Sequence, residues 1–152
     1  MSTLTKLALG LMGRLRPAPA LGDGAATLAL PAPDRSGGLP LMAALAARQS
    51  SRAFAPQALS PQQLSDLLWA AWGCNRVDGG RTAPSALNSQ EIDLYVALPE
   101  GAYRYDAAAH ALRRVVAQDL RRITGYQDFV DEAPLDLVLV ADHARMGLVP
   151  VA

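Results

Sequence analysis

The chain has 152 residues, of which 51% are hydrophobic and 18% charged, and its 14 Lys and Arg balance its 14 Asp and Glu. This length suits one domain with a sizeable core, and the composition argues against disorder as the general state. Zero net charge argues against an Arg-rich domain for nucleic acid or an acidic membrane, because no overall field attracts an anionic partner. We therefore expect neither nucleic acid nor membrane as a partner.

Reactive side chains are few and scattered. Cys74 is the single cysteine, which excludes an internal disulfide and a cysteine-based zinc site. His110 and His143 lie far apart without the spacing of a metal motif, so no metal site is predicted. The sequence "GDGAAT" at 22–27 lacks the third glycine of a dinucleotide fingerprint, and neither a P-loop nor a GxSxG elbow occurs.

Residues 1–38 are predicted to form a flexible N-terminal arm and linker. The first residues superficially resemble a secretory signal, but Arg14 and Arg16 interrupt what should be an uncharged core. The apolar run 7–12 is also far shorter than the ~20 residues that span a membrane. Residues 17–38 are rich in Pro, Ala and Gly, as in an extended linker. We expect a cytoplasmic protein, with export as the less favoured alternative.

Two helices are predicted next. The first covers "LPLMAALAARQ" at 39–49, where apolar residues recur at i, i+4 spacing. The second begins after Ser60, which is expected to be the N-cap, with Pro61 in the first helical position and Gln63 completing a capping box. Its apolar stripe, which precedes a stop at Gly73, consists of Leu64, Leu67, Leu68, Ala71 and Trp72.

The second half of the chain is rich in strand patterns. The segment "IDLYVAL" at 92–98 alternates and favours a strand. The sequence "AYRYDAAAHALRRV" at 102–115 has the form of a hairpin, with Tyr103 and Tyr105 on one face.

The last elements complete an α+β pattern. Residues 118–131 are predicted to be helical with a break near Gly125, and 134–142 form a nearly continuous apolar strand typical of a sheet's interior. Such a strand needs covering layers, yet only ten residues follow Asp142. A partner subunit or a missing part of a larger fold must then cover it. The expected fold is α+β, with helices flanking a central, mainly antiparallel sheet.

Two polar loops interrupt these elements. The loop "ARQSSRAF" at 47–54 carries Arg48 and Arg52 with two serines, and guanidinium forks suit phosphate oxygens. The loop "RTAPSALNSQ" at 81–90 lies between a helix and a strand. Taken singly, each loop is more simply an ordinary polar turn. Taken together, they would suit a phosphorylated ligand held between two loops.

Four segments, in this order and spacing, resemble the nitroreductase-like FMN flavoproteins: "LPLMAALAARQSSRAF", "LSPQQLSDLLWAAWGCNR", "RTAPSALNSQEIDLYVAL" and "AYRYDAAAHALRRV". The branch that these segments resemble most includes the azoline-forming dehydrogenases of thiazole and oxazole peptide biosynthesis. The resemblance covers about 39–142. It implies a partial FMN domain over 39–152, truncated after a central strand, whose C-terminal part would hold further flavin contacts.

The resemblance implies that the first polar loop grips the flavin phosphate. Arg48, Ser50 and Arg52 match the stretch that binds the FMN phosphate and ribityl chain, with Arg52 near the pyrimidine edge of the ring. Gln49 stands where the family often has a second Arg or His, and its amide can still form hydrogen bonds.

The second polar loop is implied to reach the flavin across a homodimer interface. Pro84, Ser85 and Ala86 match the segment that approaches the flavin from the other subunit, and Asn88 matches a residue that hydrogen-bonds the flavin edge. Independently of any cofactor, the same residues form a turn leading into the strand at 92–98.

The resemblance implies an FMN-dependent oxidoreductase that moves a hydride between NAD(P)H, or a small-molecule or peptide substrate, and an acceptor. The flavin would carry the hydride, so no catalytic side chain is expected. One alternative is a truncated, catalytically inactive module that keeps only dimerisation or binding. Another is one part of a split assembly.

Overall fold

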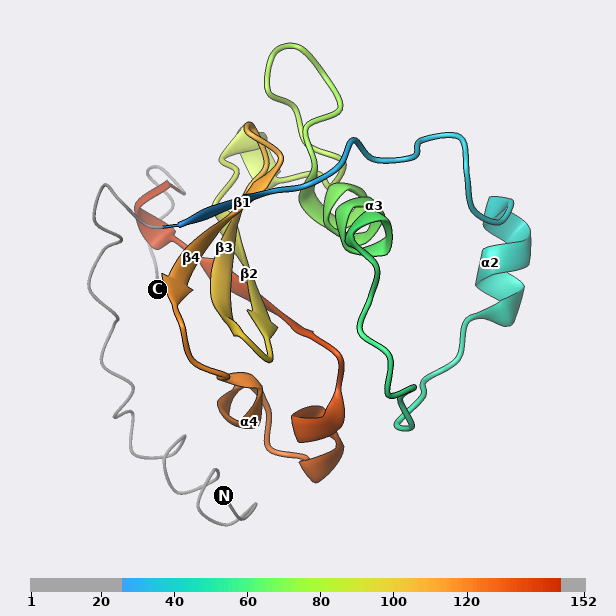
Figure 1. Cartoon of the computed structure of the whole chain (residues 1–152). Helices are drawn as coiled ribbons and strands as arrows, with labels where there is room; N and C mark the ends of the chain where they lie inside the picture. Colours follow the sequence, from blue (N-terminus) through green and yellow to red (C-terminus); the bar gives the residue numbers. More distant parts are fainter. Residues whose placement is uncertain (1–25, 146–152) are drawn as a thin grey trace, which may run out of the picture.

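The structure, a computed structural model, describes residues 26–145 (Figure 1). Its five strands form one sheet in the order β1-β4-β3-β2-β5, and each neighbouring pair is antiparallel. The strands are β1 (Thr27–Ala29), β2 (Ile92–Leu98), β3 (Gly101–Asp106), β4 (Ala111–Val116) and β5 (Asp136–Ala141). An α+β fold with an antiparallel sheet is therefore confirmed.

Helices account for the other elements. The α-helices are α2 (Leu41–Ala47), α3 (Pro61–Trp72) and α4 (Arg121–Thr124), and the 3-10 helices are η1 (Ala86–Asn88), η2 (Asp128–Glu132) and η3 (His143–Arg145). The single helix expected over 118–131 is divided into α4 and η2 at Gly125, where the break was predicted.

Helix α3 covers one face of the sheet and builds the core. Its start is fixed by a capping box: Ser60 Oγ accepts from the Gln63 backbone N–H at 3.2 Å, and Gln63 Oε1 accepts from the Ser60 N–H at 2.8 Å. Its buried side packs on strand residues, in a cluster that includes Leu64, Leu68, Trp72, Leu94, Val96, Tyr103, Tyr105 and Leu112. Leu67 belongs to the predicted stripe but is 37% exposed, because it lies at the rim of the helix face centred on Leu68.

The tyrosine pattern of β3 is confirmed. Tyr103 and Tyr105 share one face and are only 6% and 5% exposed, so both pack into the core beneath α3. Arg104, between them, lies on the opposite face.

The linker predicted over 17–38 contains a short strand. Thr27–Ala29 pairs with β4 through Leu28 opposite Leu112, and the Arg114 N–H donates to the Ala26 carbonyl at 2.9 Å. An edge strand offers unpaired backbone groups, and an extended segment satisfies them without needing an apolar pattern of its own. The first 25 residues of the arm and linker expected over 1–38 lie outside the described residues.

Strand β5 does not lie in the interior of the sheet, contrary to the prediction. It pairs with β2 and forms the edge of the sheet in the described chain. Leu139 is 67% exposed and Val140 is 43% exposed. The apolar run indicates surfaces that would be covered, but the part of the chain described here supplies no layer over them.

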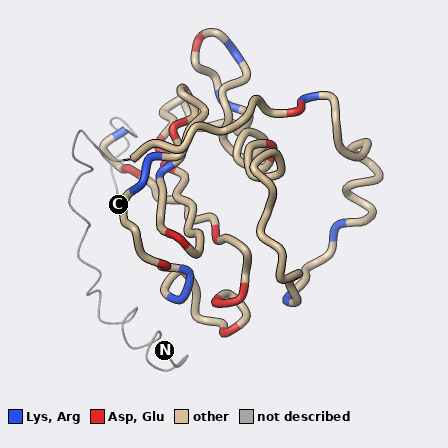
Figure 2. Tube along the Cα trace, in the orientation of Figure 1, with Lys and Arg blue, Asp and Glu red and all other residues tan. Residues whose placement is uncertain are grey.

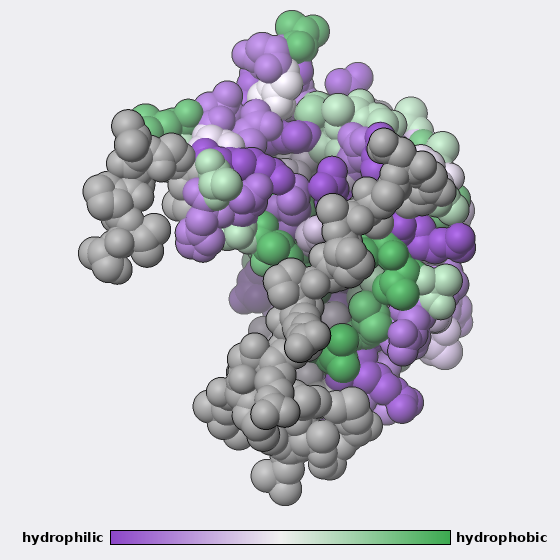
Figure 3. Space-filling model, turned by 90° about the vertical axis from the view of Figure 1, so that its left-hand side faces the viewer, coloured by the Kyte–Doolittle hydropathy of each residue, from purple (hydrophilic) through white to green (hydrophobic). Residues whose placement is uncertain are grey.

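Helix α2 lies away from the sheet (Figure 1), and none of its residues is buried. Its large apolar side chains and that of the preceding leucine are 56–75% exposed: Leu39, Leu41, Met42 and Leu45. Seen from another side, the surface is mostly hydrophilic but is interrupted by separate groups of hydrophobic residues (Figure 3). Charged residues of both signs are interspersed along the described trace (Figure 2).

Candidate functional site

The loop after α2 presents donors without internal partners. Arg48 is the C-cap of α2, and its backbone N–H donates to the Ala44 carbonyl at 3.0 Å, which directs the chain into an extended loop. The side chains of Arg48, Gln49 and Ser50 are exposed and form no hydrogen bond or ion pair within the described chain. These groups therefore remain available to a ligand or to a partner.

The end of this loop returns to the 3-10 helix η2. The guanidinium of Arg52 lies over the Phe129 ring at 5.6 Å from its centroid, and Phe54 contacts the same ring at a centroid distance of 6.4 Å. Phe54 and Phe129 also line an open pocket of about 360 Å³ between the loop and β5. Among the predicted site residues of this first loop, Arg52 is the one whose side chain contacts another described element.

A carboxyl group lies at the margin of that pocket, and its pKa is affected by burial. Burial raises the pKa of Asp136, although the Thr124 hydroxyl donates to its Oδ2 at 2.6 Å and works in the opposite direction. The wall of the pocket is otherwise apolar, with Val130, Leu135 and Leu137.

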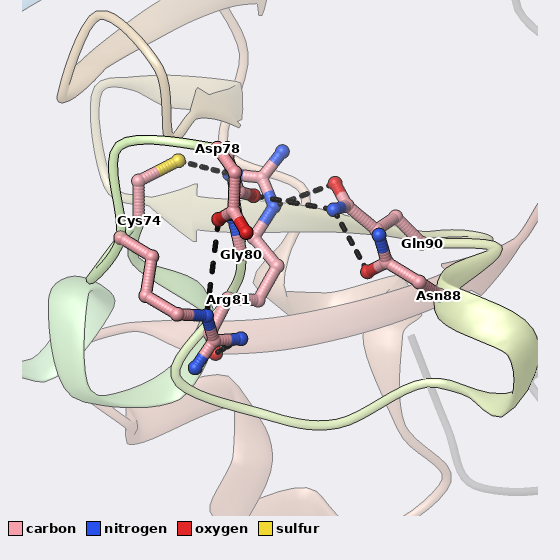
Figure 4. Close-up of polar contacts among 8 residues, drawn as sticks. Cys74, Asp78, Gly80, Arg81, Asn88 and Gln90 are labelled. Atoms are coloured by element: carbon pink, nitrogen blue, oxygen red, sulfur yellow. Dashed lines mark hydrogen bonds and ion pairs between the residues drawn. The ribbon is translucent and has the colours of Figure 1, made fainter.

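The second loop is organised around Arg81 (Figure 4). Arg81 Nε donates to Gln90 Oε1 at 3.1 Å, and one terminal nitrogen donates to Cys74 Sγ at 3.0 Å. The guanidinium also lies 5.9 Å from the centroid of the Trp72 ring, at the end of α3. Gln90 in turn donates through Nε2 to the Gly79 carbonyl and to Asn88 Oδ1, both at 3.2 Å.

The backbone of this loop is strained. Leu87, Asn88 and Gln90 have φ values of 52°, 55° and 47°, in the left-handed region that side chains other than Gly rarely adopt. Ser85 helps to hold the turn, because its Oγ accepts from the Gln90 backbone N–H at 3.0 Å. The loop presents Leu87 to solvent with 94% of its side chain exposed.

The predicted site residues form two separate groups in one chain. Pro84, Ser85, Ala86 and Asn88 lie together in and beside η1, whereas the Arg48–Arg52 loop lies below α2 on the far side of α3 (Figure 1). The two groups do not meet within one protomer.

An open pocket of about 460 Å³ lies beside the second loop. Its lining includes Arg81, Asn88 and Gln90 from the loop and Arg104 and Asp106 from the end of β3. The side chain of Arg104 has no hydrogen bond or ion pair within the described chain, whereas Asp106 is paired with Arg113 at 2.7 Å. The alternation of "YRYD" places Arg104 opposite the buried tyrosines, but nothing in the sequence alone indicated that it would line a pocket.

A buried polar network was missed by the sequence reasoning. Ser65 is fully buried, and its hydroxyl lies 2.6 Å from the Pro31 carbonyl and 2.7 Å from His110 Nε2. His110 Nδ1 lies 2.8 Å from the Tyr105 hydroxyl. The carbonyl can only accept, so Ser65 donates to it and accepts from Nε2–H, which leaves Nδ1 to accept from Tyr105. Burial, as the main cause, raises the pKa of Tyr105 to about 12.

This network is structural in character. It joins the segment after β1, helix α3 and the turn between β3 and β4, and its serine is inaccessible to a substrate. Among residues 26–145 no group of His, Cys, Asp or Glu side chains could hold a metal ion. Within the same range, no helix has both the length and the apolar character needed to cross a membrane.

Comparisons with known proteins agree on one family. The family model described as "Nitroreductase family" matches residues 45–149. A Methanocaldococcus jannaschii protein provisionally assigned as a nitroreductase is 30% identical over 108 residues, which cover 64% of this chain and 54% of that protein. The crystal structure of a provisionally assigned nitroreductase from Ralstonia eutropha JMP134 shows 55% identity and a TM-score of 0.78, covering 90% of this chain and 66% of that one. The chain thus spans about half of the first relative and about two thirds of the second.

Proposed function

Because this chain belongs to the nitroreductase family, we propose that it binds FMN and serves flavin-mediated hydride transfer between NAD(P)H or an organic substrate and an acceptor. Membership of this family supports an oxidoreductase function. The observation that carries the FMN proposal is the loop after α2, in which the side chains of Arg48, Gln49 and Ser50 have no partner among residues 26–145.

The donor chemistry of this loop fits a phosphate group. An exposed arginine gives forked N–H donors, and a serine hydroxyl and a glutamine amide add neutral donors beside it. Arg52 belongs to the same loop, but its guanidinium already lies over the Phe129 ring. This position suits a residue that orients the ligand better than one that serves as the main phosphate anchor. Arg48 is therefore proposed as the principal phosphate ligand.

The separation of the two loops supports a site shared between subunits. One protomer cannot bring Pro84–Asn88 to its own Arg48–Arg52 loop in the arrangement seen here. A homodimer would supply the second loop from the partner, and the exposed apolar residues of α2 provide a surface that such an interface would cover. In this proposal Pro84, Ser85, Ala86 and Asn88 complete the site of the other subunit.

The bound cofactor supplies the hydride chemistry, so the chain needs no nucleophile or metal. The residues of this chain bind and orient: Arg48, Gln49 and Ser50 hold the phosphate end, and Asn88 addresses the ring edge. We further propose that the substrates are of the azoline or peptide class, because the ordered motifs over 39–142 resemble that branch. The alternative, an inactive binding module, keeps the same interface without the cofactor.

The test begins with the purified chain at a neutral pH. We expect yellow protein that releases FMN on heating, or colourless protein that becomes yellow after reconstitution with FMN. Arg48→Ala should weaken FMN binding about tenfold or more, because a hydrogen bond to a charged group contributes about 1.5–3 kcal/mol.

A matched variant separates a local effect from a loss of positive charge. Arg122→Ala removes an exposed arginine of α4 that is not among the proposed FMN contacts, and should leave FMN affinity unchanged. Equal weakening by both variants, or wild-type affinity in Arg48→Ala, would contradict the assignment of the first loop. Protein that never takes up FMN as a dimer of full chains would contradict the function itself.

A further inference from the structure

The second loop contains a series of hydrogen bonds through Gln90. The neighbours of Gln90 determine which of its amide atoms donates and which accepts. Arg81 Nε is a donor only, so the Gln90 atom that it meets at 3.1 Å must be the amide oxygen. The Gly79 carbonyl is an acceptor only, so the Gln90 atom 3.2 Å from it must be the amide nitrogen. Two independent neighbours therefore impose the same orientation on the Gln90 amide.

This orientation passes to Asn88. The nitrogen of Gln90 lies 3.2 Å from the side chain of Asn88 and needs an acceptor there, which is Oδ1. Asn88 Nδ2 is then not bound by Gln90, and it has no hydrogen-bond partner within the described chain. What Asn88 offers to a ligand is consequently a pair of N–H donors.

Arg81, the first residue of this hydrogen-bond series, is anchored at the end of α3. Arg81 is tied to the end of α3 through Cys74 Sγ at 3.0 Å, through the Trp72 ring and through a backbone bridge to Cys74. The other residues of the series, Asn88 and Gln90, lie in strained backbone, because both have positive φ. Strain of this kind persists only where surrounding contacts over-determine it, and it is common at ligand sites.

We propose that Arg81 and Gln90 are positioning residues that set Asn88 as a hydrogen-bond donor toward an acceptor atom of the ligand, a carbonyl oxygen or an unprotonated ring nitrogen. The identity of that ligand as a flavin rests on the proposed function. The orientation of the Asn88 amide does not, because it follows from the protein's own contacts.

The test uses Gln90→Glu, which changes one amide into a carboxylate of the same shape. The carboxylate still accepts from Arg81, but it has no proton to give to Asn88 or to the Gly79 carbonyl. Asn88 should then reverse its amide, so that Nδ2 donates to the introduced carboxylate and Oδ1 faces the ligand. FMN affinity is expected to fall about tenfold, because two acceptors would oppose one another.

The first measurement needs no cofactor. In ¹⁵N–¹H spectra of the cofactor-free full chain, the side-chain NH₂ protons of Gln90 should exchange slowly with solvent and those of Asn88 rapidly. In Gln90→Glu the Asn88 protons should become protected, and Asn88→Asp identifies their signals by removing them. Rapid exchange at Gln90 in the wild type, or unprotected Asn88 protons in the variant, would overturn the proposal.

A second measurement adds FMN and a control. FMN should protect the Asn88 NH₂ protons in the wild type but not in Gln90→Glu. The control, Gln63→Glu, makes the same chemical change in the capping box of α3, where a carboxylate also accepts from the Ser60 N–H, and should alter neither readout. If the wild type binds no FMN at all, the proposed function fails, while the proton-exchange result still decides the orientation of Asn88.

Discussion

Helices α2 and α3 both carry large apolar residues, but within residues 26–145 only α3 buries them against the sheet. Leu64, Leu68 and Trp72 of α3 are 0–8% exposed beneath the sheet. Leu41 and Met42 of α2 are 72% and 75% exposed, and no residue of α2 is buried. Helix α3 also has a capping box, whereas the N-cap of α2 is Pro40 without a side-chain hydrogen bond.

The difference shows that periodicity predicts a helix but not its neighbour. Seven residues of helix are too few to be stable alone in water, and within the described residues α2 has no buried side chain to stabilise it. Helix α3 is stabilised by burial on its own sheet. The stability of the folded chain should therefore be concentrated in α3 and the sheet, and α2 should contribute little to it.

The largest expected effect on the free energy of unfolding comes from truncating a buried side chain of α3. Leu68→Ala should lower the free energy of unfolding by about 2–5 kcal/mol, because Leu68 is fully buried and its loss leaves a cavity. Leu41→Ala should change it by less than about 0.5 kcal/mol. Urea unfolding of both variants at low protein concentration measures this. Equal destabilisation would mean that α2 packs within the protomer.

A smaller effect is expected from alkaline pH on the core side. The folded chain holds the pKa of Tyr105 at about 12, whereas an unfolded tyrosine ionises near pH 10. The stabilisation that Tyr105 gains from this pKa difference is complete below pH 10 and is lost as the pH rises from 10 through 12. The loss should be about 1–2 kcal/mol.

Urea unfolding at pH 9 and pH 11.5 tests this pH dependence. Tyr105→Phe should remove most of it, because the variant has no group to ionise at that position. Tyr126→Phe alters a tyrosine that is 51% exposed and should leave the pH dependence intact. A pH profile of Tyr105→Phe that matches the wild type would contradict the prediction.

The smallest effect concerns the helix caps. Ser60→Ala removes the acceptor for the Gln63 N–H and should cost about 1 kcal/mol of unfolding free energy. Ser51→Ala, in the loop after α2, removes a hydroxyl whose contacts are local and exposed, and should cost a few tenths at most. Thermal unfolding of the two variants compares the regions. A larger loss for Ser51→Ala would reverse the contrast between them.

Local chemistry made much of the fold predictable from sequence. The capping box at Ser60, the break at Gly125 and the alternation of Tyr103 and Tyr105 each depend on near neighbours in the chain, and each is confirmed. Strand β1 and the position of β5 depend on pairing between distant segments, which no local pattern encodes. That is why a linker was expected for the first and an interior place for the second.

The candidate site divides in the same way. Both polar loops could be recognised by their composition, but the roles of Arg48, Asn88 and their neighbours came from a family resemblance and remain predictions. The links from Arg81 to Gln90 and from Gln90 to Asn88 could not be foreseen, because they require the loop to adopt positive φ at three residues without glycine. The same is true of His110, two of whose partners, Ser65 and Pro31, are 45 and 79 residues away in sequence.

The order in which a ribosome makes this chain has a consequence for the first strand. Residues 27–31 emerge early, yet β4 and His110, which hold them, are made about eighty residues later. At ordinary elongation rates that interval lasts about 4–16 s. During this interval residues 27–31 have no β4 strand to pair with, and Ser65 of α3 lacks His110 as a hydrogen-bond partner. The first strand to be synthesised is thus among the last to be secured.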